Sequence, residues 1–149
     1  MQKTISALLT LALSASLLLT GCGSSNVSYK DGVYTGQSSV YENDDGSDDG
    51  NGYGVVTITI EGGTITDCTF KTYETDGTLK DEDYGKEGGQ IANKDYYNKA
   101  QKANAACSEY AQLLVESGSL DGIDAISGAT INYNEFLEAV ANALEDAKE

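Results

Sequence analysis

The sequence predicts an α+β fold in which a small antiparallel, half-barrel-like sheet packs against two or three helices. Five Asp-Gly pairs divide the chain into short pieces, because glycine accepts a positive φ and Asp bonds to its own backbone at turns. Apolar residues alternate in the middle of the chain and recur at helical spacing in its last third. The length of 149 residues suits one folded domain.

Residues 1–21 are predicted to be a lipoprotein signal peptide that is not part of the fold. The apolar stretch Ile5–Leu19 follows a Lys and is too short to span a bilayer as a mature helix. It runs into Leu-Thr-Gly-Cys, so cleavage would leave Cys22 first, with a diacylglycerol on its thiol. The alternative is an ordinary secretory signal followed by an unmodified cysteine.

The predicted mature chain is an acidic domain on a lipid anchor. Residues 22–28 are expected to be the lipidated Cys and a flexible tether, and residues 29–149 the folded domain. Removing residues 1–21 takes away one Lys and no acid, so the formal net charge changes from −15 to −16. An acyl anchor would hold this domain on the outer face of a cell membrane without spanning it.

The first two predicted strands are separated by an acidic loop. Val33–Ser38 is the first strand. Val55–Ile60 is the second, because apolar and Thr residues alternate along it. Residues 42–54 between them are acidic and glycine-rich with almost nothing to bury, so this acidic loop is predicted to be mobile.

The third predicted strand, Thr64–Tyr73, returns from a Glu-Gly-Gly hairpin turn. Strict alternation places Thr66, Cys68 and Phe70 on one face and Ile65 on the other.

A long helix is predicted over Asp95–Glu116, ended by Gly118. Its apolar residues step by three and four positions, which is typical of a face that packs on a core. These residues are Tyr96, Ala100, Ala103, Cys107, Tyr110 and Leu114.

The final helix is predicted over Tyr133–Ala147. Asn132 stands where an N-cap residue belongs and Glu135 follows three positions later, which is a variant of the capping box. The expected buried stripe of this helix is Phe136, Leu137, Val140, Ala141 and Leu144.

Two cysteines remain in the predicted domain, Cys68 and Cys107. Outside the cytoplasm they could form a disulfide, and the stripe of the long helix would bring Cys107 to Cys68 if it packs on the sheet. Equally, both could be buried free thiols that act as small apolar residues.

The composition excludes several kinds of site. The chain has no His, Arg or Trp, which excludes imidazole bases, Ser-His-Asp and Cys-His catalysis, and bidentate Arg clamps on phosphate. Zinc sites that need His are excluded, three Cys cannot form a four-Cys site, and we predict no metal site. The charge of −15 argues against a nucleic-acid partner, because nucleic-acid phosphates are bound by clustered Lys and Arg.

The loop between the two helices carries the candidate chemistry. Small residues at 127–130 let another molecule approach the backbone closely. Thr130 lies just before the predicted final helix, where free N–H groups and the positive end of the helix dipole favour a phosphate. Asp124 lies six positions earlier. Taken alone, such a loop is more often an ordinary turn.

The segment Asp124-Ala-Ile-Ser-Gly-Ala-Thr130 resembles the flavinylation motif of the FMN-binding domain family. That family includes the C subunit of the sodium-pumping NADH:quinone oxidoreductase, the G subunit of the Rnf complex and extracellular flavin lipoproteins of Gram-positive bacteria. Residues 29–36 resemble the family's opening strand, and residues 53–67 resemble its central hairpin. Nearly the whole predicted mature chain is covered.

The resemblance implies that an FMN transferase joins the phosphate of FMN to Thr130 as a phosphoester. Ser127, Gly128 and Ala129 would shape the loop that the transferase recognises, and Asp124 would occupy the acidic position of the motif.

The chain departs from the family pattern in two places. Asn132-Tyr133 stands where many members have Thr-Ser, and Glu-Thr-Asp-Gly at 74–77 stands where many have Glu-Thr-Pro-Gly. These departures leave open which residues contact the flavin ring, and the alternative for each candidate named next is an ordinary, partly buried Tyr. Tyr53, Tyr84 and Tyr133 are candidates for stacking on it.

The implied function is that of an electron carrier rather than an enzyme with its own substrate. Covalent FMN would take electrons from a membrane quinol-linked donor and pass them to an extracellular acceptor or a second flavoprotein.

One alternative is a non-redox surface lipoprotein that binds Ca²⁺ or a small ligand through the acidic loop. Residues 45–50 are similar to the start of an EF-hand loop, although its twelfth position is Val56 rather than Glu. A further alternative is that the protein has this fold but carries no flavin, because no transferase acts on it.

Overall fold

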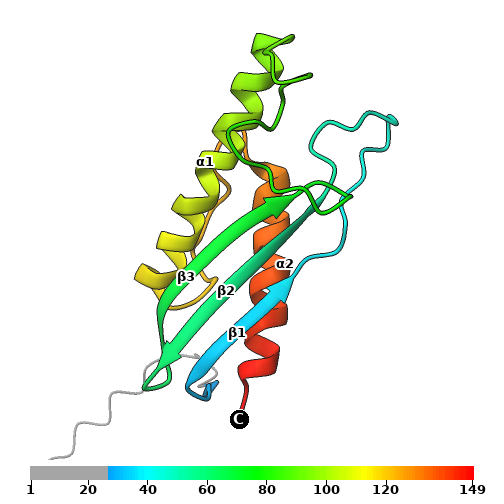
Figure 1. Cartoon of the computed structure of the whole chain (residues 1–149). Helices are drawn as coiled ribbons and strands as arrows, with labels where there is room; N and C mark the ends of the chain where they lie inside the picture. The colour runs from blue at the N-terminus through cyan, green and yellow to red at the C-terminus, as the bar shows by residue number, and fades with distance from the viewer. Residues whose placement is uncertain (1–26) are drawn as a thin grey trace, which may run out of the picture.

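The computed structural model describes residues 27–149, so the predicted signal peptide, Cys22 and most of the predicted tether lie outside the described residues. The described elements are β1 (Gly32–Gln37), β2 (Tyr53–Glu61), β3 (Thr64–Tyr73), α1 (Lys94–Ser117) and α2 (Thr130–Ala147). These three strands form an antiparallel sheet in the order β1-β2-β3, and both helices cover one face of it (Figure 1). The predicted α+β fold is confirmed.

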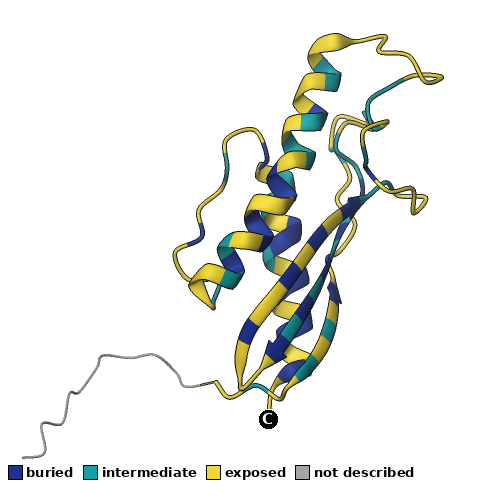
Figure 2. Ribbon diagram, turned by 60° about the vertical axis from the view of Figure 1, so that its left-hand side comes forward, coloured by how far each residue is buried: buried dark blue, intermediate teal, exposed yellow. Residues whose placement is uncertain are grey.

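The apolar core lies between the sheet and the two helices. β2 alternates regularly, so Val56, Ile58 and Ile60 face the helices and are almost completely buried. α2 packs on β1 and β2, whereas α1 packs on β3. The buried positions in Figure 2 accordingly run along the middle of the sheet and the inner sides of the helices. Neither described helix is apolar enough over a sufficient length to cross a membrane.

A β-bulge changes which residues of β3 face the core. β3 has one residue more than β2 between the strand pairs Thr59–Asp67 and Ile60–Ile65. As a result Thr66 is exposed and Ile65 is buried. The prediction that Thr66 shares a face with Cys68 and Phe70, with Ile65 on the other face, was wrong, because strict alternation does not allow for an extra residue in one strand.

α1 begins and ends within one residue of its predicted bounds. The side chain of Asn93 caps it by accepting a hydrogen bond from Tyr96 N at 3.1 Å. Gly118 ends it with a φ of 71°, and its N–H donates to Leu114 O at 2.8 Å. Of the predicted stripe, Tyr96 and Ala103 are half-buried, and the others are buried: Ala100, Cys107, Tyr110 and Leu114.

α2 begins at Thr130, three residues earlier than predicted. Ala129 is its N-cap residue and provides no side-chain cap. Asn132 therefore lies inside the first turn, where its amide donates to Ala103 O at 3.1 Å and to Cys107 Sγ at 3.2 Å. The predicted capping box was wrong because the Asn132 side chain finds its partners on the neighbouring helix.

The buried face of α2 is set by a close approach to β1. A Cβ atom on Gly36 would lie 2.0 Å from Ala139 O, so a larger residue does not fit there. Ala139 and Ala143 are buried at this contact, whereas Leu137 is half-buried and Ala141 is exposed, contrary to the predicted stripe. The rest of that stripe is buried as expected: Phe136, Val140 and Leu144.

Cys68 and Cys107 are both buried free thiols in the structure, which corresponds to the second of the two alternatives. Burial raises the pKa of the Cys68 thiol to about 12 and also raises the pKa of Cys107. Both thiols are therefore protonated at neutral pH and contribute to the core as small apolar groups.

Candidate functional site

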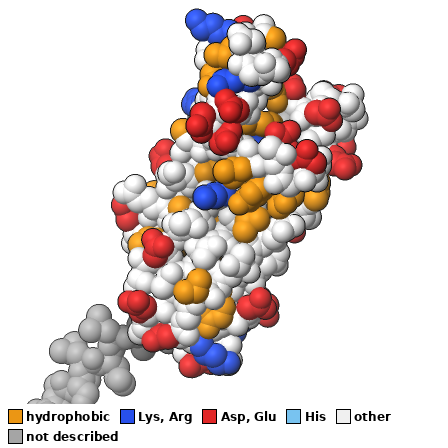
Figure 3. All heavy atoms as spheres, in the orientation of Figure 1, with side chains coloured by type: hydrophobic (Ala, Val, Ile, Leu, Met, Phe, Trp, Pro, Cys, Tyr) orange, Lys and Arg blue, Asp and Glu red, His pale blue; other side chains and the backbone are white. Residues whose placement is uncertain are grey.

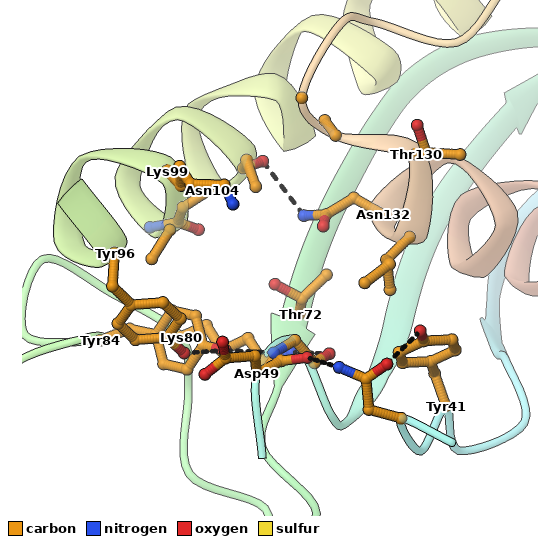
Figure 4. A pocket seen from close by; sticks show the side chains of 17 residues that line it. Tyr41, Asp49, Thr72, Lys80, Tyr84, Tyr96, Lys99, Asn104, Thr130 and Asn132 are labelled. Atoms are coloured by element: carbon orange, nitrogen blue, oxygen red, sulfur yellow. Dashed lines mark hydrogen bonds between the residues drawn. The ribbon is translucent and has the colours of Figure 1, made fainter. Parts of the chain in front are cut away.

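A cavity of about 400 Å³ opens at the end of the sheet where β2 begins and β3 ends (Figure 4). Its volume falls in the range of small-molecule sites, roughly 300–1,000 Å³. Four segments line it: the acidic loop, the segment from the end of β3, the first half of α1 and the start of α2. The lining residues are Tyr41, Asn43, Asp49, Gly50, Thr72, Lys80, Tyr84, Tyr96, Lys99, Ala100, Ala103, Asn104, Gly128, Ala129, Thr130, Ile131 and Asn132.

The start of α2 forms one wall of this cavity. Thr130 is the first residue of the helix and is exposed, and Figure 4 shows its hydroxyl turned away from Thr72 on the opposite side. Because Ala129 supplies no capping side chain, the first N–H groups of the helix have no side-chain cap. These N–H groups and the positive end of the helix dipole favour a phosphate at this place.

Lysines gather beside the same loop. Gly128 has a φ of 85°, and a Cβ atom there would lie 3.5 Å from Lys102 Nζ, so the loop lies directly against α1. Lys99 and Lys80 line the cavity. Among the charged side chains on the face in Figure 3, acidic ones are more widely spread than lysines. In a chain with a net charge of −15, this local positive charge complements an anionic ligand.

The acidic loop is held by hydrogen bonds, contrary to the predicted mobile loop. The Asn43 amide donates to Ser47 Oγ at 3.0 Å within the loop. Lys80 Nζ donates to Gly50 O at 2.9 Å, and Gly50 N donates to Tyr84 OH at 3.3 Å. Composition does not predict the last two of these bonds, because Lys80 and Tyr84 come from a distant part of the sequence.

The acidic loop shows no set of side chains arranged for a cation. Asp45 Oδ1 accepts a hydrogen bond from Ser47 N at 2.8 Å, as in an ordinary Asx turn. Within residues 27–149, no three Asp, Glu, Cys or His side chains lie close enough together to hold a metal ion. The similarity to an EF-hand loop therefore gains no support from a ligand cluster.

A buried polar cluster, made of Thr72, Lys80 and Glu135, lies at the inner end of the cavity. Their exposed fractions are 1%, 7% and 3%. Thr72 and Lys80 line the cavity, and Figure 4 shows the Thr72 hydroxyl directed into it. Neither Thr72 Oγ1 nor either carboxylate oxygen of Glu135 has a hydrogen-bond partner. The Thr72 hydroxyl is shielded from solvent, and the Cys107 thiol lies near enough to interact with it.

Burial dominates the pKa values in this cluster. It raises the pKa of Glu135 to about 7, and the positive charge of Lys80 acts in the opposite direction. Burial also lowers the pKa of Lys80, against the negative charges of Glu135 and Glu74. Near neutral pH, both protonation states of Glu135 are therefore populated.

The structure brings half of the predicted site residues to the cavity. Thr130, Gly128, Ala129 and Tyr84 line it. Tyr84 contacts Tyr96, with the two hydroxyl oxygens 3.3 Å apart and the ring centroids 6.4 Å apart, so the two rings form an aromatic wall.

The other four predicted residues lie outside the cavity lining. Tyr53 stacks on Tyr73 at a centroid distance of 5.5 Å, and Tyr133 donates to Ile123 O at 2.8 Å. Both tyrosines thus already contact other residues of the chain and lie outside the cavity where the flavin would stack. Asp124 and Ser127 are exposed in the loop before α2, where their predicted part in recognition by the transferase stays a prediction.

Sequence reasoning missed most of the cavity wall that lies opposite Thr130. Thr72 and Lys80 carry no motif, and their role follows from where β3 ends and where the next segment turns back. Glu135 did carry a signal, because it lies four and eight positions before Ala139 and Ala143 on the buried face of α2.

The model of the FMN-binding domain family matches residues 50–145, which run from just before β2 almost to the end of α2. The chain belongs to the FMN-binding domain family. The matched region contains the buried polar cluster, both helices and Thr130, so this is a flavin-binding chain. β1 and the resemblance at residues 29–36 lie outside the matched region.

Two solved structures are similar to the chain, and the first of them supports a likeness of fold. A crystal structure of a Clostridium perfringens protein is 24% identical, with a TM-score of 0.57, and the match covers 80% of this chain and 88% of that one. A solution structure of a Clostridium thermocellum protein is also 24% identical, with a TM-score of 0.40 over 78% of this chain and 91% of that chain. No curated protein matches the chain.

The residues present fit bound FMN. The uncapped start of α2 and the nearby lysines suit its phosphate, and the Tyr84–Tyr96 wall suits an aromatic ring.

Proposed function

We propose that this FMN-binding chain is an extracytoplasmic electron carrier whose FMN is joined covalently to Thr130 by a phosphoester bond. The observation that carries the proposal is the position of Thr130. It is the first residue of α2, it is exposed, and it lines the cavity beside N–H groups that lack a side-chain cap. A phosphate attached there would keep its favourable electrostatic environment while its flavin entered the cavity.

The attachment step would form a bond between Thr130 Oγ1 and the phosphorus of a flavin nucleotide. An FMN transferase would supply that nucleotide with its phosphate esterified to a leaving group, which departs as the Thr130 hydroxyl loses its proton. The exposure of Ser127 and Gly128 leaves room for the enzyme to approach this loop. Asp124, which is also exposed, would be recognised by the transferase and would not contact the flavin.

The residues of the chain would hold and orient the cofactor, and FMN would supply the redox chemistry. Tyr84 and Tyr96 would contact the ring, since they form the aromatic wall of the cavity. Lys99 and Lys102 would complement the phosphate from α1. Tyr84 is itself oriented by Gly50 N, which ties the acidic loop to the aromatic wall.

We further propose that a diacylglycerol on Cys22 anchors the domain to the outer face of the cell membrane. This position would keep the flavin close to a quinol-linked donor in the membrane and open to an extracellular acceptor or a second flavoprotein. A covalent bond is useful there, because a dissociable cofactor released outside the cell would be lost by diffusion.

Attachment is tested by expressing the mature domain together with an FMN transferase and viewing a denaturing gel under ultraviolet light. We expect a fluorescent band from the native sequence and from Thr130→Ser, which keeps the hydroxyl. Thr130→Ala should lose the fluorescence completely, whereas Thr69→Ala, on an exposed position of β3, should keep it. A fluorescent Thr130→Ala band, or no fluorescence with an active transferase, would refute covalent attachment at Thr130.

The anchor is tested with the full chain in a bacterium that processes lipoproteins. The native protein should sediment with membranes, and Cys22→Ser should appear in the soluble or secreted fraction. Equal membrane association of both proteins would contradict lipidation of Cys22.

A further inference from the structure

Glu135 has no role in attachment of the flavin, yet it is the most unusual side chain of α2. It lies in the second turn of the helix that begins at Thr130. Its side chain is buried, with 3% of the residue exposed, and neither carboxylate oxygen has a hydrogen-bond partner. A carboxylate without hydrogen bonds in such a place is costly, so a function is the natural reason for keeping it.

Glu135 is joined to the cavity through its neighbours in the buried polar cluster. A Cβ atom on Gly54 would lie 3.0 Å from Glu135 Cβ, and Gly54 is the strand partner of Thr72. The charge of Glu135 also acts on Lys80. Both Thr72 and Lys80 line the cavity, whereas Glu135 lies behind them, so a change of charge inside the cavity acts on Glu135 across these two residues.

The other titratable groups that face the cluster come from β3 and α1. Glu74, just after β3, acts on Lys80, and Cys107 on α1 is influenced by both Lys80 and Glu135. The Cys107 thiol is held by Asn132 and its pKa is raised by burial, so it stays neutral. Lys80 is therefore the cation whose charge acts on Glu135 without a direct ion pair, because its Nζ donates to Gly50 O and lies 5.1 Å from the centroid of the Tyr84 ring.

We propose that Glu135 takes up one proton when the FMN bound in the cavity is reduced, and releases it when the FMN is oxidised. The proposal rests on the proposed function and assigns a new role within the same site. Two electrons arrive from the quinol-class donor and one proton joins the flavin ring, which leaves one negative charge on the ring. The Glu135 carboxylate then takes a second proton from water and becomes a neutral carboxyl group.

The physical reason is the shared environment of the two charges. While the ring is uncharged, Lys80 balances an ionised Glu135. When the ring becomes negative, two negative charges share a single buried cation, and the protonated form of Glu135 is favoured. Transfer of the electrons to the acceptor removes the ring charge and reverses the step.

The first test compares the pH dependence of the midpoint potential in the flavin-loaded native protein, Glu135→Gln and Glu138→Gln. Glu138 is a matched control because it is exposed on the same helix, and a Gln there can still accept from Ser39 Oγ. Dithionite serves as reductant between about pH 6 and pH 9. The slope of midpoint potential against pH gives the number of protons bound on reduction. Near neutral pH, this number should be larger by up to one proton per two electrons in the native protein and Glu138→Gln than in Glu135→Gln. Equal proton uptake in all three proteins would overturn the proposal.

The second test uses the flavin-free mature chain, so it does not depend on attachment. Carbon NMR of the glutamate carboxyl groups should show one Glu that titrates near neutral pH, and this signal should be lost in Glu135→Gln. In Lys80→Met, that titration should shift to higher pH. A Glu135 that is already ionised at about pH 5 would overturn the proposal even if FMN attaches normally. Loss of the fluorescent band with a normal Glu135 titration would count against the proposed function instead.

Discussion

The space between the sheet and the helices has two parts that differ in how well their polar groups are satisfied. Under β2, Phe136 packs on Phe70 and Tyr110 at ring centroid distances of 5.1 and 5.4 Å, and the surrounding residues are apolar. At the cavity end, Thr72 and Glu135 are buried to a similar degree but lack hydrogen-bond partners. We call these two parts the apolar core and the cavity end.

The difference indicates that residues of the apolar core serve stability and that residues of the cavity end serve function. Apolar side chains in the core gain free energy from burial and packing. Unpaired polar groups at the cavity end lower the stability of the empty fold, so their replacement should stabilise it. The same substitutions should weaken binding of the flavin. The comparison can therefore be tested, because stability and flavin binding should change in opposite directions.

The largest expected effect is on the apolar core. Phe136→Ala removes a completely buried ring, so the free energy of unfolding should fall by about 4 kcal/mol. Urea unfolding at neutral pH measures this loss. The molecules that remain folded should still accept FMN at Thr130, because the ring does not line the cavity. A loss below about 1 kcal/mol would show that the region is not tightly packed.

The next effect is the pH dependence that Glu135 gives to the cavity end. Its pKa is raised from 4.5 to about 7 by burial, so the folded state holds this proton more tightly than the unfolded state. Protonated Glu135 therefore makes its full contribution to the free energy of unfolding at pH values below the pKa of Glu in the unfolded chain. This contribution is lost as the pH rises through the folded-state pKa of about 7. The loss amounts to about 3 kcal/mol.

The direction of this change in the free energy of unfolding is tested by denaturing the native chain, Glu135→Gln and Glu138→Gln at about pH 5 and about pH 8. Glu135→Gln should be the more stable protein at the higher pH, and its stability should change less between the two values. If it unfolds more easily than the native chain at the higher pH, then Glu135 is paired and the cavity end does not lower stability.

A reciprocal pair of isosteric substitutions contrasts the two regions directly. Thr72→Val removes an unpaired buried hydroxyl at the cavity end and should raise the free energy of unfolding by about 1 kcal/mol. Val56→Thr places such a hydroxyl in the apolar core and should lower it by about 2 kcal/mol. Thermal or urea unfolding measures both changes, and changes of the same sign would remove the distinction between the regions.

The smallest effect on stability is expected at the surface lysines. Lys102→Gln should change the free energy of unfolding by less than about 0.5 kcal/mol, yet it should slow FMN attachment because Lys102 lies against Gly128. Lys30→Gln is the matched control, since Lys30 lies at the opposite end of the sheet, where its N–H donates to Ala147 O. The rate at which the fluorescent band appears separates the two variants, and equal rates would deny Lys102 a part in positioning phosphate.

Local patterns were sufficient where each residue's role depends on its close neighbours in sequence. The alternation in β2, the Gly118 end of α1 and its main apolar stripe all follow from the period of the structure and from backbone geometry. The motif that ends at Thr130 likewise places an exposed hydroxyl at a helix start.

Local patterns failed where a distant segment decided the outcome. Ile65 is buried because β3 contains an extra residue opposite β2, and Asn132 faces α1 instead of capping α2. Sequence favoured large residues on the buried face of α2, yet Gly36 on β1 approaches so closely that Ala139 fits there. Each of these choices is a matter of packing between elements, which has no period along the chain.

The sequence by itself determined an α+β domain, its main elements and its membership of a flavin-binding family, and it suggested Thr130 as the residue for our proposed attachment of the flavin. Only the tertiary structure decided what surrounds that flavin. Glu135 comes 63 positions after Thr72 in the sequence, and the two lie close together because Gly54 at the start of β2 pairs with Thr72 and lies against Glu135 on α2. Their burial, and with it the proton affinity of Glu135, arises from exclusion of water by neighbours that the chain contacts only when folded.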